Sequence, residues 1–303
     1  MSSDDGDLAG CAGTWPGPAL HDPEGSRVPD GIRVFDAHVH LFPDRLFEAI
    51  WRWFDAHAWP VRYRLHAEQV IEFLVGHGVE RFCGLAYSHK PGMSRDLNRF
   101  MIEIARAQSQ VVPLGTVLPG EPDAEEIVRE ALGPLGLRGL KLHCHVQQIA
   151  ADDPRIDPIY AASSANGTPV LIHAGREPSF PGYRIDARAI CAAERVARVL
   201  ERHPRLVLVI PHLGMDEYDD YARLTNGCDR LHLDTTMAIA RYFEQRPSSD
   251  VFPGCAARLH YGTDFPNLPF AWDRELKRIL AEVPAGPIRG AILWDNAARL
   301  FGT

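Results

Sequence analysis

The stretch Arg33-Val-Phe-Asp-Ala-His-Val-His40 decides the fold and the chemistry that we expect of this chain. It has the pattern of a buried β-strand that ends in two histidines. Because side chains alternate between the two faces of a strand, His38 and His40 point to the same side. Two imidazoles on one face are suitable nitrogen ligands for a divalent metal ion. Asp36 precedes the pair at the same parity, and we expect it to orient an imidazole ring.

Three further polar residues stand where other apolar runs end. They are His173, His212 and Asp264, and each comes at or just after the end of a predicted strand. A lone histidine in such a place is often a structural residue. Together with the His38 and His40 pair, however, these residues complete a nitrogen and oxygen ligand set for one metal ion.

Short apolar runs alternate with longer helical patterns along the chain. Several runs are apolar throughout, which is typical of strands covered on both faces in a parallel sheet. The strand candidates are Arg33–His38, Arg81–Tyr87, Val111–Val117, Leu137–Leu142, Pro169–His173, Leu206–Pro211, Arg230–Asp234 and Arg258–Gly262. Eight strand and helix units in series predict a (β/α)8 TIM barrel, with an open doubly wound sheet as the alternative. A barrel would gather the polar strand ends at one mouth, where such folds keep their active sites.

The predicted barrel accounts for residues 31–303 as a single domain, because such barrels often exceed the length of an average domain. Residues 1–30 are rich in Gly, Pro, Asp and Ser and lack apolar periodicity. We therefore expect them to form a flexible or loosely draped N-terminal arm.

Composition excludes several classes of partner. The chain carries a net charge of −8 and has no run of Lys or Arg, which argues against binding to nucleic acid. No apolar run reaches the roughly 18 residues that a membrane span needs, and the acidic N-terminus lacks a signal-peptide pattern. The six cysteines include no CxxC pair, so we expect reduced thiols. A cytoplasmic location is the default expectation, and the expected partner is a small-molecule substrate.

The ligand set leaves one histidine for another task. We expect His38, His40, His173 and Asp264 to hold one divalent metal. A fourth histidine would overfill a site that must keep a water molecule, so His212 is assigned to general acid/base catalysis. Asp264 could instead cap a helix. As a ligand that also touches the bound water, it would act as the catalytic base.

Candidate substrate-binding residues come from two other segments. Lys141 and His143 share one face of their predicted strand. Lys141 could bind a substrate carboxylate, pair with Asp264, carry a carbamate that bridges a second metal, or form a structural salt bridge. Arg176, in a Gly- and Pro-rich loop after His173, suits a carboxylate because its guanidinium is planar. The aromatic segment Trp51–Trp59 is open to three interpretations: a lid, a homodimer contact or simple helix packing.

These motifs in combination resemble those of the amidohydrolase superfamily. The resemblance covers about residues 32–302 and is closest to the "amidohydrolase 2" branch, which includes aminocarboxymuconate semialdehyde decarboxylase and related decarboxylases. It depends on Asp36-Ala-His-Val-His40, Gly139-Leu-Lys-Leu-His143, Leu171-Ile-His-Ala174, Pro211-His-Leu-Gly214, Tyr261-Gly-Thr-Asp-Phe-Pro266 and Trp294-Asp-Asn-Ala-Ala-Arg-Leu-Phe301.

The resemblance implies a (β/α)8 barrel with one divalent metal, usually zinc and sometimes manganese. It implies metal ligands at His38, His40, His173 and Asp264, and a histidine at His212 that polarises the reacting group or donates a proton. Lys141 stands where relatives with two metals carry a carboxylated lysine, so a second metal there stays open. Some decarboxylases have Glu-x-His in place of the two-histidine motif, a difference that favours the two-histidine branch without excluding decarboxylation.

Two enzymatic functions follow from this site. The first is a metal-dependent hydrolase, in which a metal-bound water attacks an ester, lactone or amide carbon of a small molecule. The alternative is a metal-dependent, non-oxidative decarboxylase of a small aromatic or semialdehyde carboxylate. A non-catalytic scaffold would need no acid/base group, and His212 argues against that third hypothesis.

Overall fold

The computed structural model describes residue 23 and residues 27–302. Its strands are β1 (Phe35–His40), β2 (Arg81–Leu85), β3 (Val111–Pro113), β4 (Gly115–Thr116), β5 (Leu140–His143), β6 (Val170–His173), β7 (Leu208–Ile210), β8 (Leu231–Asp234) and β9 (Leu259–His260). All neighbouring strands pair in parallel, in the orders β1-β2-β3 and β4-β5-β6-β7-β8-β9. Each predicted strand is present, and the run Val111–Val117 is divided into β3 and β4.

Backbone hydrogen bonds continue across the division between β3 and β4. The amide of Leu114, which lies between these strands, donates to the carbonyl of Gly84 at 3.1 Å. The amide of Arg138 donates to the carbonyl of Pro113 at 2.8 Å. The interruption at Leu114 is therefore an irregularity within one strand direction and leaves no open edge there.

The last strand also meets the first. Ala37 donates its amide proton to the carbonyl of Tyr261, and His40 donates to the carbonyl of Phe265, both at 2.8 Å. Val39 and Phe265 form a parallel bridge. The strands thus close on themselves as a (β/α)8 barrel, which confirms the predicted fold and explains why the ends of β1 and β9 lie together.

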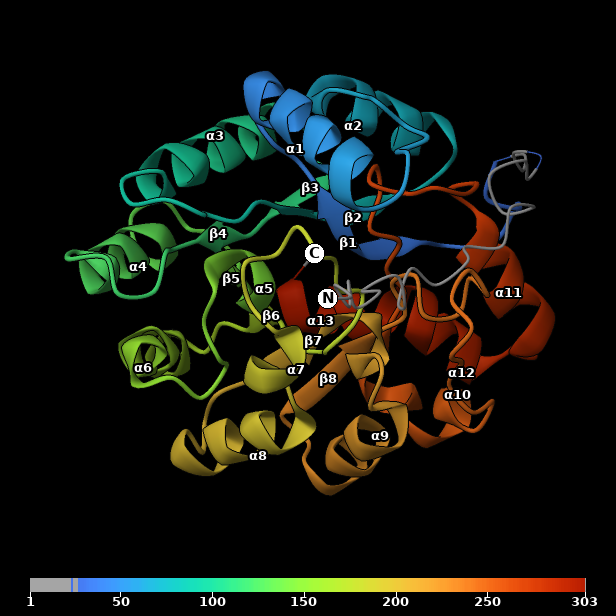
Figure 1. Cartoon of the computed structure of the whole chain (residues 1–303). Coiled ribbons are helices and arrows are strands. Elements are labelled where there is room, and N and C mark those ends of the chain that lie inside the picture. The colour runs from blue at the N-terminus through green and yellow to red at the C-terminus, as the bar shows by residue number, and fades with distance from the viewer. Residues whose placement is uncertain (1–22, 24–26, 303) are drawn as a thin grey trace, which may run out of the picture.

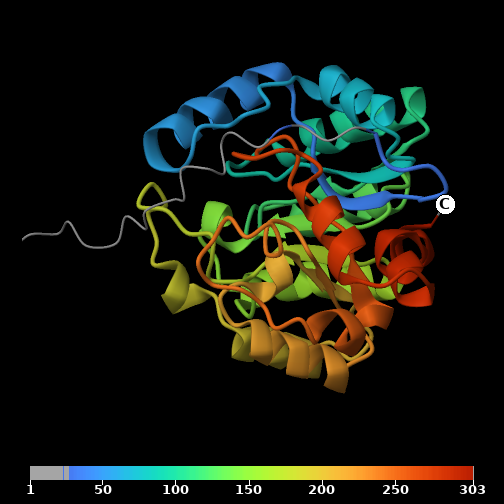
Figure 2. The same ribbon diagram turned by 90° about the vertical axis from the view of Figure 1, so that its right-hand side faces the viewer.

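The helices are α1 (Asp44–His57), α2 (Ala67–Gly76), α3 (Ser94–Ala107), α4 (Ala124–Leu132), α5 (Cys144–Gln147), α6 (Asp157–Asn166), α7 (Ala187–Ile190), α8 (Ala193–Arg202), α9 (Tyr218–Gly227), α10 (Val251–Gly254), α11 (Arg274–Glu282), α12 (Pro287–Gly290) and α13 (Asn296–Phe301). Most of them surround the strands on the outside, as Figures 1 and 2 show from two directions, whereas α13 lies behind the centre of the ring of strands in Figure 1. Among the described residues, no helix has both the length and the apolar character that crossing a membrane requires.

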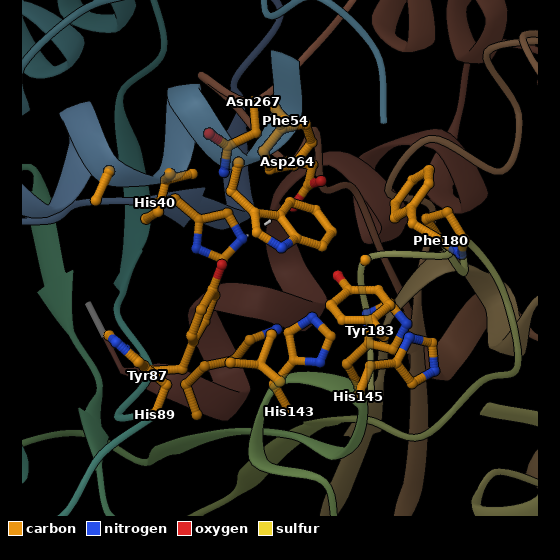
Figure 3. A pocket seen from close by; sticks show the side chains of 18 of the residues that line it. His40, Phe54, Tyr87, His89, His143, His145, Phe180, Tyr183, Asp264 and Asn267 are labelled. Atoms are coloured by element: carbon orange, nitrogen blue, oxygen red, sulfur yellow. Dashed lines mark hydrogen bonds and ion pairs between the residues drawn. The ribbon is translucent and has the colours of Figure 1, made fainter. Parts of the chain in front are cut away.

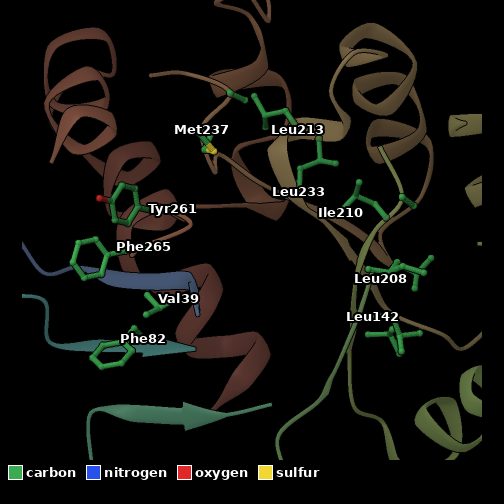
Figure 4. Packing of buried hydrophobic residues seen from close by; sticks show 14 of the residues in the cluster. Val39, Phe82, Leu142, Leu208, Ile210, Leu213, Leu233, Met237, Tyr261 and Phe265 are labelled. Carbon is green, nitrogen blue, oxygen red and sulfur yellow. The ribbon is translucent and has the colours of Figure 1, made fainter. Parts of the chain in front are cut away.

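Apolar side chains fill two separate regions. The larger lies between the strands and the outer helices, where Val39, Phe82, Leu142 and other buried residues pack (Figure 4). The smaller lies inside the barrel and contains Phe35, Leu85, Leu171, Val209, Trp294 and Phe301. This inner cluster, which we call the barrel plug, occupies the interior beneath the polar strand ends. The polar side chains therefore stand on an apolar floor that excludes water.

A β-bulge in β1 decides which of its side chains face the interior. Asp36 pairs with Phe82 and His40 with Leu85, and the register shifts by one residue between Asp36 and Val39. The bulge breaks the period of two, so Asp36 and His40 lie on opposite faces of the strand. Asp36 accepts hydrogen bonds from the His38 amide at 3.0 Å and from the Thr263 hydroxyl at 2.6 Å. The expectation that Asp36 orients an imidazole ring is therefore wrong.

The predicted N-terminal arm falls mostly outside the described residues. Residues 1–22 and 24–26 belong to that part of the chain. Val28 is described and is buried, and its amide donates to the carbonyl of His77 at 2.7 Å. The packed body therefore begins slightly before Gly31, where composition places the boundary.

Candidate active site

A cavity of about 520 Å³ opens at the carboxyl ends of the barrel strands. Figure 3 shows side chains of its lining, among them His40, His143, His145 and Asp264. The sequence-predicted site residues that line it are His38, His40, Lys141, His143, His173, His212 and Asp264. Side chains from five different strand ends thus reach one concave site, as the barrel prediction requires.

Three of the four predicted metal ligands form a compact group. One ligand atom each from His38, His40 and Asp264 lie within 4.8 Å of one another. The Asp264 Oδ1 atom is 2.9 Å from His40 Nε2 and 3.4 Å from His38 Nε2. Two imidazole nitrogens and one carboxylate oxygen are donors that suit zinc and manganese alike.

The backbone holds Asp264 in an unusual conformation. Its φ is 73°, in the left-handed region that residues other than glycine rarely adopt. The Asp264 amide donates to the carbonyl of His38 at 2.9 Å, which ties the carboxylate to the end of β1. Burial opposes ionisation of this carboxyl, but its hydrogen bond to His40 and its electrostatic interactions with His40, His212 and Lys141 outweigh burial and lower its pKa. Asp264 is therefore ionised at neutral pH.

His173 lies beside the group of three. Its ring stands 4.7 Å from that of His212 and stacks on that of His143 at 4.3 Å, measured between ring centroids. Its Nε2 atom is buried and has no hydrogen-bond partner among the described residues. Burial, followed by the nearby histidines and Lys141, lowers the pKa of His173 well below its usual value, so the ring is neutral. Its role as the fourth ligand stays a prediction.

Asp234, at the end of β8, orients His38 and was missed by the sequence reasoning. Its Oδ2 atom is 2.9 Å from His38 Nδ1. Burial, followed by the charge of Lys141, lowers the pKa of His38 well below its usual value. The neutral ring therefore donates its Nδ1 proton to Asp234 and keeps a lone pair on Nε2, the atom that faces Asp264. The only sequence signal was an acidic residue that closes the run Leu231-His-Leu-Asp234.

His212 is fixed by contacts of its backbone and its ring. Its φ is 57°, and its amide donates to Asp234 Oδ1 at 3.1 Å. The Nδ1 atom donates to the carbonyl of Thr236 at 2.9 Å, which leaves Nε2 as an acceptor. Burial is the main reason that the pKa of His212 falls to about 4, although Asp264 opposes the shift. A neutral imidazole of fixed tautomer can accept a proton, as its predicted acid/base role requires.

Lys141 is fully inside the site. Its Nζ atom is 3.2 Å from His38 Nε2, and the side chain is buried. Burial lowers its pKa to about 8, while Asp264 and Asp234 favour the charged form. The ammonium therefore stands among two carboxylates and one predicted ligand. This position agrees with its predicted place in the barrel interior and leaves substrate binding and a carbamate open.

The histidines of β5 and α5 form one wall of the cavity. His143 and His145 have ring centroids 5.5 Å apart, and the His145 ring lies 4.6 Å from that of His173. The Nδ1 atoms of both His143 and His145 are buried without a hydrogen-bond partner in the described residues. These atoms can meet a polar group of a bound molecule.

Arg176 does not line the cavity. Its guanidinium pairs with Glu217 and lies 3.8 Å from Asp216, and Arg176 is absent from the residues that line the cavity. An arginine already matched by two carboxylates is poorly placed to bind another. The structure therefore gives no support to Arg176 as a substrate ligand, whereas the cationic residues Lys141, Lys90 and Arg184 do line the cavity.

Aromatic side chains from α1 and from the loop after β6 form another part of the cavity lining. Trp53 and Phe54 come from α1, Trp59 follows that helix, and Phe180 and Tyr183 come from the loop after β6. We call these five residues the aromatic roof. Within the described chain, the aromatic segment Trp51–Trp59 thus contributes to the lining of the site, which agrees with the lid interpretation.

Comparison with known proteins covers nearly the whole barrel. A family model described as amidohydrolase matches residues 35–303. No curated protein matches this sequence. Several solved structures share the fold.

An uncharacterized TIM-barrel protein from Bordetella bronchiseptica is 20% identical, with a TM-score of 0.68, over 89% of this chain and 98% of that one. A 5-carboxyvanillate decarboxylase from Sphingomonas paucimobilis is 20% identical, with a TM-score of 0.62, over 89% and 99% of the two chains. A 5-carboxyvanillate decarboxylase from Novosphingobium aromaticivorans, solved with bound manganese, is 12% identical, with a TM-score of 0.63, over 93% and 100%. At these identities the likeness concerns the fold alone.

Proposed function

The chain belongs to the amidohydrolase family, and from that premise we propose that it is a metal-dependent, non-oxidative decarboxylase of a small aromatic carboxylate. The observation that carries the proposal is the site itself. A ligand group of His38, His40 and Asp264 faces the buried ammonium of Lys141 inside a cavity with an aromatic roof. Decarboxylases among the similar folds support the same assignment.

The donor set fits one divalent cation. His38, His40 and Asp264 would hold it, and the unpartnered Nε2 atom of His173 is the natural fourth donor. When bound, the cation would supply positive charge that holds the acidic oxygens of the substrate. Manganese is supported by one relative of similar fold, while zinc is expected from the ligand types.

The protein's own side chains provide the remaining steps. Lys141 adds a second positive charge for the carboxylate that leaves. As the bond between the ring and the carboxylate breaks, CO2 departs and its bonding electrons stay on the ring carbon, which must take up a proton. The proton comes from solvent water: His212 accepts it on its free Nε2 atom and passes it to the ring carbon, while the aromatic roof limits further access of water to that carbon.

Hydrolysis is the second candidate function, although it was the first expectation from the sequence. The two-histidine motif at His38 and His40 favours it, because some decarboxylases of the family have Glu-x-His there. Asp264, which is ionised, would act as the base, and His212 would protonate the leaving group. The decarboxylases among the similar folds favour the first candidate over this one.

A product assay separates the two functions. Purified protein loaded with Mn²⁺ or Zn²⁺ is incubated with 5-carboxyvanillate, 2,6-dihydroxybenzoate, an aryl ester and a lactone, and release of CO2 and of acid is measured. We expect CO2 release that a chelator abolishes and that the H212N variant loses by about 100-fold or more. Acid release without CO2 would overturn the decarboxylase in favour of the hydrolase, and activity that survives full chelation would overturn both.

A small-molecule substrate, a homodimeric assembly and a cytoplasmic location are further parts of the proposal that rest on the sequence. A second metal at a carboxylated Lys141 is the alternative to the single metal and the Lys141 ammonium proposed above. Size-exclusion chromatography with light scattering tests the dimer. Metal analysis of the purified protein tests one ion against two.

A further inference from the structure

Two segments that are distant in the sequence meet above the cavity. Trp53 in α1 and Tyr183 in the loop after β6 have ring centroids 4.9 Å apart, at an interplanar angle of 34°. Trp59 and Phe180 make a second contact between the same segments, at 5.0 Å. The aromatic roof is therefore continuous across the two segments, and its inner face lines the site.

Tyr183 lies between the rest of the aromatic roof and the histidines His143 and His145. Its ring centroid lies 5.3 Å from that of His145 and 6.4 Å from that of His143 (Figure 3). A molecule in the cavity must therefore present an apolar surface to Trp53 and a polar group to the histidines, with Tyr183 at the boundary. That division matches a ring with an acidic substituent.

Trp53 differs from the tryptophan two residues before it on the same helix. Trp51 is 9% exposed, stacks on Phe47 at 5.7 Å and does not line the cavity. Trp53 is half-buried and lines the cavity, and its ring partners come mainly from the end of its own helix and from the loop after β6. Packing of α1 on the barrel explains the position of Trp51. It does not explain why the Trp53 ring lines the cavity.

The contact between the two segments depends on a glycine. A Cβ atom at Gly182 would lie 2.5 Å from His57 Cγ and 2.8 Å from His57 Cβ. These distances are far below van der Waals contact, and the clash involves atoms near the backbone of α1, which cannot easily swing away. No side chain larger than hydrogen fits there while the roof stays closed.

We infer that Trp53 and Tyr183 form an aromatic wall that selects planar, acid-bearing rings, and that the absence of a side chain at Gly182 lets the two segments approach closely enough at His57 to form this wall. The inference rests on the proposed function, which requires the substrate to carry an acidic group. The new part is the assignment of the residues that select the ring. Offset or tilted contact of the wall with an aromatic ring is favourable by about tenfold in affinity beyond the burial of area, and a saturated ring of the same size lacks that term.

Equilibrium binding tests the wall independently of catalysis. The full chain, with Mn²⁺ added, is titrated calorimetrically with benzoate and with cyclohexanecarboxylate, which share the acid and differ in planarity. We expect benzoate to bind about tenfold more tightly, the W53A variant to reduce that ratio to less than twofold, and Y183F to retain it. The matched control R52A, on an exposed position of the same helix, should keep the wild-type ratio. A wild-type ratio near one, no binding of benzoate, or an unchanged ratio in W53A would overturn the inference.

A double-substitution cycle tests the closure. G182A leaves every side chain of the wall in place, yet we expect it to lower the ratio at least threefold, because the two segments must separate. The H57G/G182A pair removes the clash and should restore the ratio to within twofold of H57G alone. An unchanged ratio in G182A, or no restoration in the pair, would overturn the assigned role of Gly182. If the binding ratio behaves as stated while no CO2 is released, the wall stands and the proposed function fails. If CO2 is released but benzoate and cyclohexanecarboxylate bind equally well, the proposed function stands and the aromatic wall fails.

Discussion

Replacing Asp234 by asparagine tests how the site prepares its first metal ligand. The carboxylate accepts two hydrogen bonds through different oxygens, from His38 Nδ1 at 2.9 Å and from the His212 amide at 3.1 Å. Asparagine has nearly the same shape but only one acceptor oxygen. If that oxygen keeps the His212 amide, the NH2 group faces His38 Nδ1 and favours the tautomer whose proton is on Nε2.

We expect D234N to lose metal affinity, because its single acceptor oxygen cannot serve both His38 and the His212 amide. With its proton on Nε2, His38 has no lone pair directed at Asp264 and at the cation. Changing a partner that orients a ligand typically lowers metal affinity by about 10–100-fold, which corresponds to about 1.4–2.7 kcal/mol. If the amide flips to accept from His38, the buried His212 amide loses its acceptor instead, at a cost of about 1–3 kcal/mol in the free energy of unfolding. Either outcome is measurable.

The assay pairs two measurements on D234N. Competition with a chromophoric chelator gives the Zn²⁺ and Mn²⁺ affinities, and urea denaturation of the metal-free protein gives the free energy of unfolding. E275Q is the matched control, because Glu275 is also buried and accepts a backbone hydrogen bond, from Met237 at 2.9 Å, but touches no predicted ligand. A D234N variant that retains wild-type affinity and wild-type stability would refute the assignment of Asp234.

Three further predictions concern acid stability, the core and the loop arginine. Burial lowers the pKa of His212 to about 4, so between pH 6.5 and 4 the unfolded chain binds a proton that the folded chain does not. The unfolding free energy should therefore fall with decreasing pH across this window. Asparagine tolerates the left-handed backbone at this position. In urea titrations, H212N should reduce the slope of the unfolding free energy against pH by about 1.4 kcal/mol per pH unit. L171A truncates a fully buried side chain of the barrel plug and should cost about 2–5 kcal/mol in the same assay. R176A should change the calorimetric affinity for benzoate less than twofold, because Glu217 already pairs with Arg176; a tenfold loss would restore Arg176 to the site.

The sequence predicts the barrel and the compact ligand group because both depend on local patterns. Apolar runs separated by helical patterns specify the parallel strands, and a barrel brings their carboxyl ends together. His38, His40 and Asp264 meet because each stands at such an end. The prediction needed no knowledge of loops, since the strand ends converge whatever the loops do.

Three features of the site depend on three-dimensional structure that a one-dimensional pattern does not contain. The extra residue of the β1 bulge turns Asp36 away from the histidines, and strand parity cannot reveal a bulge. Arg176 and Glu217 are 41 positions apart, so their pairing exists only in the folded chain. The left-handed backbone at His212 and Asp264 likewise has no signal in residue type, because glycine is the usual occupant of that region.

The two carboxylates of the site owe their different roles to their surroundings. The barrel plug excludes water from below and the aromatic roof limits it from above, so burial acts on both. Asp234 accepts hydrogen bonds from a neutral ring and an amide, and burial raises its pKa to about 7 despite the nearby charge of Lys141. Asp264 contacts His40 and feels His212 and Lys141, and these interactions lower its pKa although burial opposes them. Groups whose environments separate their pKa values in this way take different tasks. Asp264, which stays charged beside the ligands, is the carboxylate that can bind a cation or take a proton from a bound molecule, whereas Asp234 acts through the groups that it positions, the His38 imidazole and the His212 backbone.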